Sequence, residues 1–155
     1  MKVVAPHPDV RIRTFYDYEI KGPFLTPSEA DMFRVLEELA HRNVRIMCKP
    51  RLADVVQPIS GGLSAFNKIS QKHVDFLICS VIDWWPVFAV ELDDASHDTK
   101  KRKEADVFKN ELFASTGLPL IRIRVQELHY KEHLVANLNH CWNTRLGYVV
   151  DAGVR

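Results

Sequence analysis

The chain has 155 residues, which fits one domain with a sizeable buried core. Its formal net charge of +1 is not that of a strongly basic protein, so nucleic-acid binding would depend on a local patch of positive charge. Cys48, Cys79 and Cys141 are odd in number and widely spaced, which favours reduced thiols in a cytoplasmic protein over disulfides or a zinc site. We expect no signal peptide, no membrane span and no small organic cofactor.

The N-terminal part predicts an extended arm followed by a helix. Residues 1–25 alternate apolar and charged side chains, which indicates an added edge strand or arm. Thr26, Pro27 and Glu29 then form a helix start with a capping box, and the helix is expected to run to about His41. Glu29 also lies on the apolar stripe of this helix.

The middle of the chain predicts the strands of a sheet. The stretch 44–48 indicates the first core strand, and residues 51–56 its continuation or a returning strand. A loop is expected over residues 58–64 because glycine, proline and serine gather there. Two apolar runs, 74–78 and the run from Pro86, then predict buried strands joined by a turn.

The last part predicts a helix, a strand and a closing helix. The helix that follows the acidic run is expected to start at Asp98 or Thr99 and to end at Gly117. A strand over residues 118–125 and a helix near residues 134–147 complete the pattern, with residues 148–155 as a tail. This order indicates an α/β domain over residues 26–147, with a central mixed sheet and helices on its faces.

Acidic residues lie at one end of the two apolar runs. Glu91 and Asp93 are two apart in the second run and point to one face, and Asp75 joins them if the two runs pair. Neighbouring carboxylates in a partly dry site are unfavourable unless a proton or a cation offsets them, and oxygen ligands suit Mg²⁺ or Mn²⁺. A single aspartate here is more simply explained as a helix cap or a surface ion pair, but the Asp75 and Glu91 pair favours a metal site.

The sequence also resembles a known family. The resemblance rests on three motifs: Val74-Asp-Phe76, Ala89-Val-Glu-Leu-Asp-Asp-Ala-Ser-His97 and Gly117-Leu-Pro-Leu-Ile-Arg-Ile123. Together with the basic helix between them, they resemble the domain-of-unknown-function family 2726 over roughly residues 25–125. That family belongs to the PD-(D/E)XK, or restriction-endonuclease-like, superfamily of nucleases. The resemblance implies a central mixed sheet flanked by helices and metal-dependent cleavage of DNA.

The resemblance assigns roles to individual residues. Asp75 corresponds to the family aspartate and Glu91 to the family acid, with Asp93 as a further metal ligand. The superfamily lysine, two residues after the acid, is replaced here by Asp93. That lysine usually helps to position the attacking water and to stabilise the developing charge. In some members a glutamate in the first helix also contributes to the metal site, which would give Glu29 a role besides capping.

Two residues are candidates to replace the missing lysine. His97 follows the acidic strand, as in the very-short-patch-repair-like branch of the superfamily, and a histidine that titrates near neutrality suits a general base. Lys109 lies on the helix beside the site, although a simple ion pair with Asp106, three residues away, explains it equally well. His97 ranks first, so His97→Ala is expected to abolish most cleavage and Lys109→Ala to cost less.

Basic residues near the acids suggest contacts to DNA phosphates. The candidates are Lys72, Lys100, Lys101, Arg102 and Lys103. A basic first turn is unfavourable for the helix dipole, which supports a phosphate contact, although a solvated face remains the alternative. The sequence therefore predicts a metal-dependent phosphodiesterase acting on DNA. The alternative is an inactive nuclease-like domain that binds nucleic acid or serves assembly, and the oligomeric state stays open.

Overall fold

The computed structural model describes residues 18–40, 44–93 and 100–130, together with residues 132, 134 and 138. For residue 39 and residues 100–103 it describes the backbone only. Within these ranges, no helix is both long enough and apolar enough to span a membrane.

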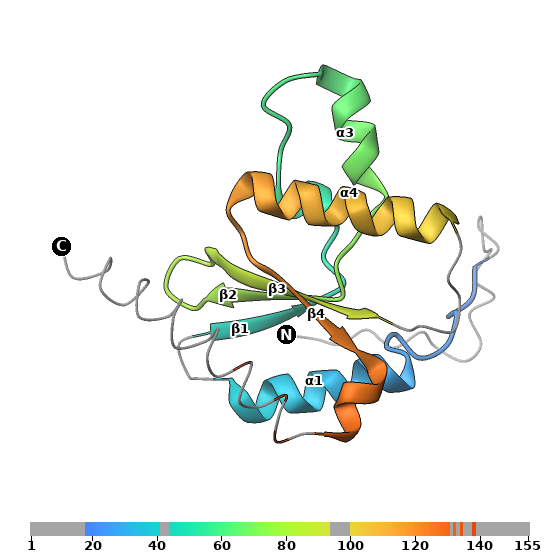
Figure 1. The fold of residues 1–155 in the computed structure, drawn as a ribbon, viewed down its shortest axis with the longest axis vertical. Coiled ribbons are helices and arrows are strands. Elements are labelled where there is room, and N and C mark those ends of the chain that lie inside the picture. Colours follow the sequence, from blue (N-terminus) through green and yellow to red (C-terminus); the bar gives the residue numbers. More distant parts are fainter. Residues whose placement is uncertain are drawn as a thin grey trace, which may run out of the picture.

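The described elements alternate between helices and strands, as expected for an α/β domain (Figure 1). In chain order they are α1 (Pro27–Leu39), β1 (Val44–Cys48), α2 (Leu52–Val55), α3 (Gly62–Ser70), β2 (Phe76–Ser80), β3 (Pro86–Asp93), α4 (Lys100–Thr116), β4 (Leu120–Arg124) and the 3-10 helix η2 (Val125–His129).

The strands form a four-stranded mixed sheet in the order β1-β2-β3-β4. The pairs β1–β2 and β2–β3 are antiparallel, while β3–β4 is parallel. A parallel pair needs a crossover connection, and α4 supplies it between β3 and β4. The predicted fold class, a central mixed sheet flanked by helices, is therefore confirmed.

Helices cover both faces of the sheet (Figure 1). One core packs α1 through Met32 and Leu36 against the sheet residues Phe76, Phe88 and Val90. The other packs α4 through Phe113 against the opposite face, which carries Leu77, Cys79 and Ala89. Because side chains alternate along a strand, Glu91 shares the α4 face with Ala89, and Leu92 faces α1.

Several predicted elements agree with the structure. The capping box of Thr26 and Glu29 is present at the start of α1, which ends at Leu39. The first strand is confirmed over residues 44–48. Gly117 follows α4 with φ of 70°, a left-handed conformation that glycine adopts without strain. Leu134 and Leu138 are buried and helical, but the remainder of the predicted closing helix lies outside the described residues.

Other predicted elements were wrong. Residues 51–56 form no strand: Arg51 makes one isolated bridge to His73, and Leu52–Val55 is the short helix α2. Arg51 also holds Asp54 by a side-chain hydrogen bond of 2.8 Å, a spacing that suits a helical turn. The expected loop over residues 58–64 ends at Gly61, because α3 begins at Gly62. This helix extends beyond α4 (Figure 1). For residues 1–25, the sequence left an arm or an edge strand open. Residues 18–25 form no strand, which leaves the arm, and residues 1–17 lie outside the described part.

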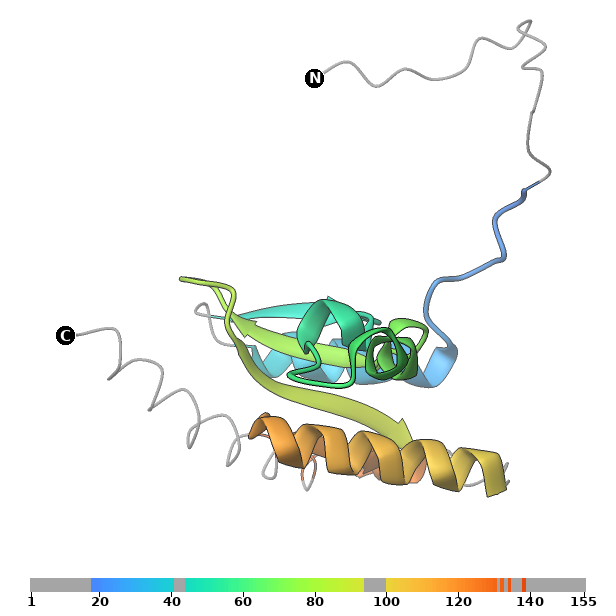
Figure 2. The same cartoon turned by 90° about the horizontal axis from the view of Figure 1, so that it is seen from above.

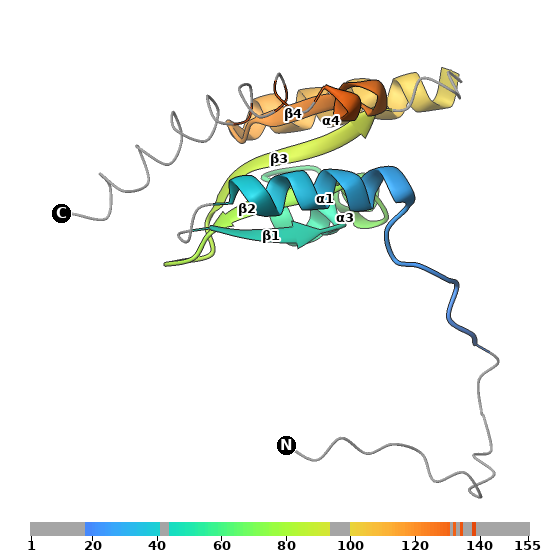
Figure 3. The ribbon, with the colours of Figure 1, turned by 90° about the horizontal axis from the view of Figure 1, so that it is seen from below.

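The sheet opens at one end, and this opening creates the site. The β2–β3 ladder runs only as far as the pair Phe76–Val90, whereas β3 continues to Asp93 beside β4. β3 twists strongly, so its end turns away from β1 and towards α4 (Figures 2 and 3). Asp75 and Glu91 lie just beyond the last paired residues, on either side of this opening.

Candidate functional site

Asp75 is held where the backbone ladder between β2 and β3 ends. Its Oδ2 accepts a 2.8 Å hydrogen bond from the backbone N–H of Leu92, so the carboxylate replaces the missing strand partner. Its backbone carbonyl accepts a hydrogen bond from Lys49 N–H at 2.8 Å. The side chain is buried, and burial raises the pKa of Asp75, although the Leu92 hydrogen bond and the charge of Lys109 oppose this effect.

Glu91 is the most unusual acid in the described part of the chain. It is 8% exposed, and its Oε1 pairs with the ammonium of Lys109. Its Oε2 is buried and has no hydrogen-bond partner among the described residues. Burial, with a smaller contribution from the charge of Asp75, raises the pKa of Glu91 to about 7 despite the opposing charge of Lys109. A buried carboxylate with one unpartnered oxygen is a site where a cation would be stabilising.

Glu29 reaches the same region from the first turn of α1. Besides forming the capping box, its Oε2 lies 2.9 Å from the ammonium of Lys49. Burial alone would raise the pKa of Glu29, but hydrogen bonds from Lys49 and Thr26 hold it below its usual value. Glu29, Asp75 and Glu91 together line a cavity of about 350 Å³, which is also bordered by Thr26 and Ser28. Glu29 therefore caps α1 and lines this cavity, while its contribution to a metal site stays a prediction.

Asp93 is placed differently from Glu91, the other acid of β3. Its Oδ1 accepts a hydrogen bond from Arg122 at 2.6 Å, and Arg122 also pairs with Asp106 on α4 at 3.2 Å. The simple Asp106–Lys109 ion pair that the spacing suggested does not form, because Arg122 takes Asp106 and Lys109 turns to Glu91. The structure thus brings together Asp75, Glu91 and Lys109, and it pairs Asp93 with an arginine.

The remaining predicted site residues divide into two groups. Lys72 is described: its ammonium donates to the backbone carbonyl of Lys68 at 2.8 Å and lies 5.1 Å from the ring centre of Phe108. His97 lies outside the described residues. The basic run of residues 100–103 forms the first turn of α4, but its side chains are also outside the described part. Their proposed contacts therefore stay predictions.

The carboxylates of the acidic cavity can be compared with the ligands that a divalent cation requires. In the described ranges, no three histidine, cysteine, aspartate or glutamate side chains are arranged to hold a metal ion. Mg²⁺, however, is often held by only one or two carboxylates and keeps water and substrate oxygens as its other ligands. Asp75 and Glu91 provide two buried carboxylates, and the unpartnered Oε2 of Glu91 is the kind of oxygen that such an ion would satisfy. The residues present therefore fit the ion through Asp75 and Glu91.

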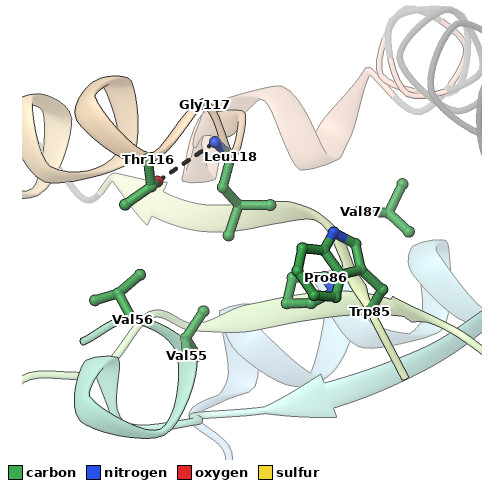
Figure 4. Close-up of a pocket in the computed structure, with 8 residues that line it drawn as sticks. All are labelled: Val55, Val56, Trp85, Pro86, Val87, Thr116, Gly117 and Leu118. Atoms are coloured by element: carbon green, nitrogen blue, oxygen red, sulfur yellow. Dashed lines mark hydrogen bonds between the residues drawn. The ribbon is translucent and has the colours of Figure 1, made fainter. Parts of the chain in front are cut away.

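A second cavity lies at the opposite end of β3. It has a volume of about 300 Å³ and lies between the end of α2, the start of β3 and the turn after α4 (Figure 4). Apolar side chains such as Val55, Trp85 and Leu118 surround it, and Leu118 N–H donates to the hydroxyl of Thr116 at 3.4 Å. No charged side chain of the described residues lines this cavity. The candidate catalytic and metal-binding groups of the described residues lie instead at the acidic end of the sheet.

The sequence did not predict the contacts of two residues of the site, Lys49 and Arg122. Lys49 comes directly after β1 and adopts a left-handed backbone conformation, with φ of 50°. No sequence motif predicted this conformation. Arg122 lies on β4 opposite Glu91 in the parallel register. From the sequence, Arg122 could reach a phosphate or cover the sheet edge, and its pairing with Asp93 and Asp106 could not be foreseen because the strand order was not known.

The fold and the site define a class: an α/β domain with a mixed sheet whose open end presents buried carboxylates next to a lysine. The family model described as "Protein of unknown function (DUF2726)" matches residues 21–140, so the chain belongs to this family. No curated protein and no solved structure matches the chain.

Proposed function

We propose that this domain is a metal-dependent phosphodiesterase that cleaves DNA, with the restriction-endonuclease-like fold of the PD-(D/E)XK superfamily. The observation that carries the proposal is the buried Asp75–Glu91 pair at the open end of the sheet, with one unpartnered oxygen and the ammonium of Lys109 beside it. In the superfamily that the motifs resemble, the sheet likewise opens where the aspartate strand and the glutamate strand lie side by side.

Each residue has a distinct task in this proposal. Asp75 and Glu91 would hold Mg²⁺ or Mn²⁺, which supplies a Lewis acid and a more acidic bound water. Lys109 provides positive charge next to Glu91, where it can stabilise the negative charge that develops on a phosphate oxygen. The superfamily lysine two residues after the acid is thus replaced by a lysine from α4, and Asp93 is balanced by Arg122.

A second function has a specific observation in its favour. The described site contains no group of three metal-binding side chains, and Lys109 and Arg122 already offset the charges of Glu91 and Asp93. A domain of this kind can keep its carboxylates while serving as a nucleic-acid-binding or assembly module. The two functions differ in one respect, since only the enzyme breaks phosphodiester bonds.

The test is a cleavage assay on single-stranded, duplex and branched DNA with Mg²⁺ or Mn²⁺. Cleavage should stop with EDTA and in Asp75→Asn and Glu91→Gln, because these substitutions remove the negative charge that binds the ion. Lys109→Ala should lower the cleavage rate by about 100-fold, the usual cost of losing one group that stabilises transition-state charge. His97→Ala is assayed in parallel: if His97 is the general base that the sequence suggested, this variant loses more activity than Lys109→Ala.

The matched control is Asp54→Asn, which removes an exposed acid that pairs with Arg51 and does not line the acidic cavity. It should cleave at the wild-type rate. If the wild-type protein binds DNA and cleaves none of the substrates with either ion, the enzyme proposal fails and the binding module replaces it.

A further inference from the structure

Arg122 is the most highly connected side chain among the described ion pairs. Its Nε donates to Asn110 Oδ1 at 2.9 Å and its Nη1 to Asp93 Oδ1 at 2.6 Å. Its Nη2 lies 3.2 Å from a carboxylate oxygen of Asp106 and 3.4 Å from the backbone carbonyl of the same residue. All three nitrogens of the guanidinium are therefore engaged, and the planar fork joins β3, β4 and α4.

The α4 partners of Arg122 flank Lys109. Asp106 lies three residues before Lys109, and Asn110 comes directly after it. Without Arg122, Asp106 would be the natural partner of Lys109, because oppositely charged residues three apart on a helix are neighbours. Asp93 would be a second competitor, since it follows Glu91 by two residues and lies on the same face of β3. Arg122 binds both competitors.

We propose that Arg122 is a positioning residue: by holding Asp106 and Asp93, it directs the ammonium of Lys109 to Glu91. The inference rests on the proposed function, because Lys109 and Glu91 are the groups that it serves. Burial supports the assignment. The side chain of Glu91 is 11% exposed, whereas those of Asp93 and Asp106 are 38% and 37% exposed. A lysine that moved to either competitor would therefore become more accessible to solvent.

This role can be measured without any nuclease activity. Lysine acetylation, followed residue by residue by mass spectrometry, reports how accessible each ammonium is. In Arg122→Gln, the acetylation rate of Lys109 should rise about threefold to fivefold, the factor that corresponds to a partly exposed ion pair. Lys72 serves as the internal reference, because its ammonium lies over Phe108 of α4. A general loosening of α4 would accelerate both lysines, whereas loss of positioning accelerates Lys109 alone.

The matched control is Arg124→Gln. Arg124 lies two residues further along β4, is 75% exposed and pairs with Glu127 at 3.5 Å. This variant has the same change of charge on the same strand and should leave Lys109 unchanged. Adding Asp93→Asn and Asp106→Asn to Arg122→Gln removes the competitors, so the rate at Lys109 should return towards the wild-type value.

The proposal is overturned if Arg122→Gln leaves the rate at Lys109 unchanged, if Lys72 accelerates equally, or if the triple variant stays as reactive as Arg122→Gln. Should Arg122→Gln not fold, Arg122→Lys replaces it, because lysine keeps the charge but cannot hold two acids with a planar fork. An unchanged rate in that variant is equally decisive. Because acetylation is read from the protein alone, a wild-type chain without nuclease activity would refute the proposed function and leave this test intact.

Discussion

At the scale of single residues, Glu91 is a buried acid whose ionisation lowers the stability of the fold that contains it. Ionising a buried carboxylate is unfavourable, and one of its oxygens has no partner among the described residues. Lys109 offsets part of this cost but not all of it, since the pKa still rises to about 7. Such an imbalance is expected of a group that binds a cation, and it leads to a test in pH-dependent stability.

The first prediction concerns Glu91→Gln. The unfolded chain releases the Glu91 proton near the usual pKa of 4.5, whereas the folded protein keeps it up to about pH 7. The folded state binds more protons in this window, so ionisation of Glu91 lowers stability as pH rises through it, and the loss persists above pH 7. Glutamine imitates the protonated acid. At pH 8 without divalent ions, Glu91→Gln should therefore raise the free energy of unfolding by about 1–3 kcal/mol.

Urea denaturation at pH 8 and at pH 4 measures this difference. Near pH 4 the gain should vanish, because Glu91 is then protonated in both states. Glu111→Gln, an exposed substitution on α4, is the control and should show no comparable gain at pH 8. A gain at pH 4 as large as that at pH 8 would show that ionisation of Glu91 is not its cause.

At the scale of elements, α4 combines an apolar anchor with a charged start. Phe113 is 2% exposed and holds the second half of the helix on the sheet. The first turn contains Lys100, Lys101, Arg102 and Lys103, whose positive charges are unfavourable beside the positive end of the helix dipole. The turn therefore gains from a negative partner, and the phosphate backbone of DNA is one.

The second prediction concerns this basic turn. Neutralising residues 100–103 to glutamine should weaken DNA binding and flatten its salt dependence. The slope of log K against log salt should fall in magnitude by about 0.9 for each phosphate of duplex DNA that the protein no longer neutralises. Fluorescence anisotropy at several salt concentrations gives the slope. Arg34→Gln with Arg51→Gln removes two exposed charges in ion pairs elsewhere and should keep it. An unaltered slope after neutralising the turn would exclude these residues from the interface.

At the scale of the whole molecule, two layers of helices hold an opened sheet. The core on the α1 face and the core on the α4 face are separate, and the acidic end of β3 lies between the two helices (Figures 1 and 3). A cation bound between Asp75, next to β2, and Glu91 on β3 would join the strands at the place where their ladder has ended. Such a bond should stabilise the whole domain.

The third prediction is that Mn²⁺ raises the melting temperature of the wild-type protein. A ligand at about 100 times its Kd stabilises the folded state by about 2.7 kcal/mol, which corresponds to a rise of several degrees. The double variant Asp75→Asn with Glu91→Gln should lose the rise, while Asp54→Asn should keep it. Differential scanning fluorimetry with a titration of Mn²⁺ is sufficient. Equal stabilisation of the double variant would mean that the ion binds elsewhere.

Short-range signals in the sequence determined much of this protein. The capping box defined the start of α1, the apolar runs defined β1 and β3, and Gly117 marked the end of α4, because each signal acts between residues close in the chain. The pattern of acids identified Asp75 and Glu91 as site candidates, and the resemblance to the family, whose model matches residues 21–140, added Lys109. It failed at α2 and α3, because helices this short depend on tertiary packing, here the burial of Leu52 and Ile69 in the core on the α4 face.

Only the tertiary structure decided which charges meet. Lys109 could pair with Asp106 on its own helix or with an acid of β3, and local spacing favours the former. The outcome depends on Arg122, which is 16 residues from Asp106 and 29 from Asp93 in sequence, and which the parallel pairing of β3 with β4 brings to both. The burial of Glu91 has the same origin, since α4 connects β3 to the parallel strand β4 and thereby covers this face of the sheet. Ion pairs between distant segments follow from that order, and no pattern along the chain encodes it.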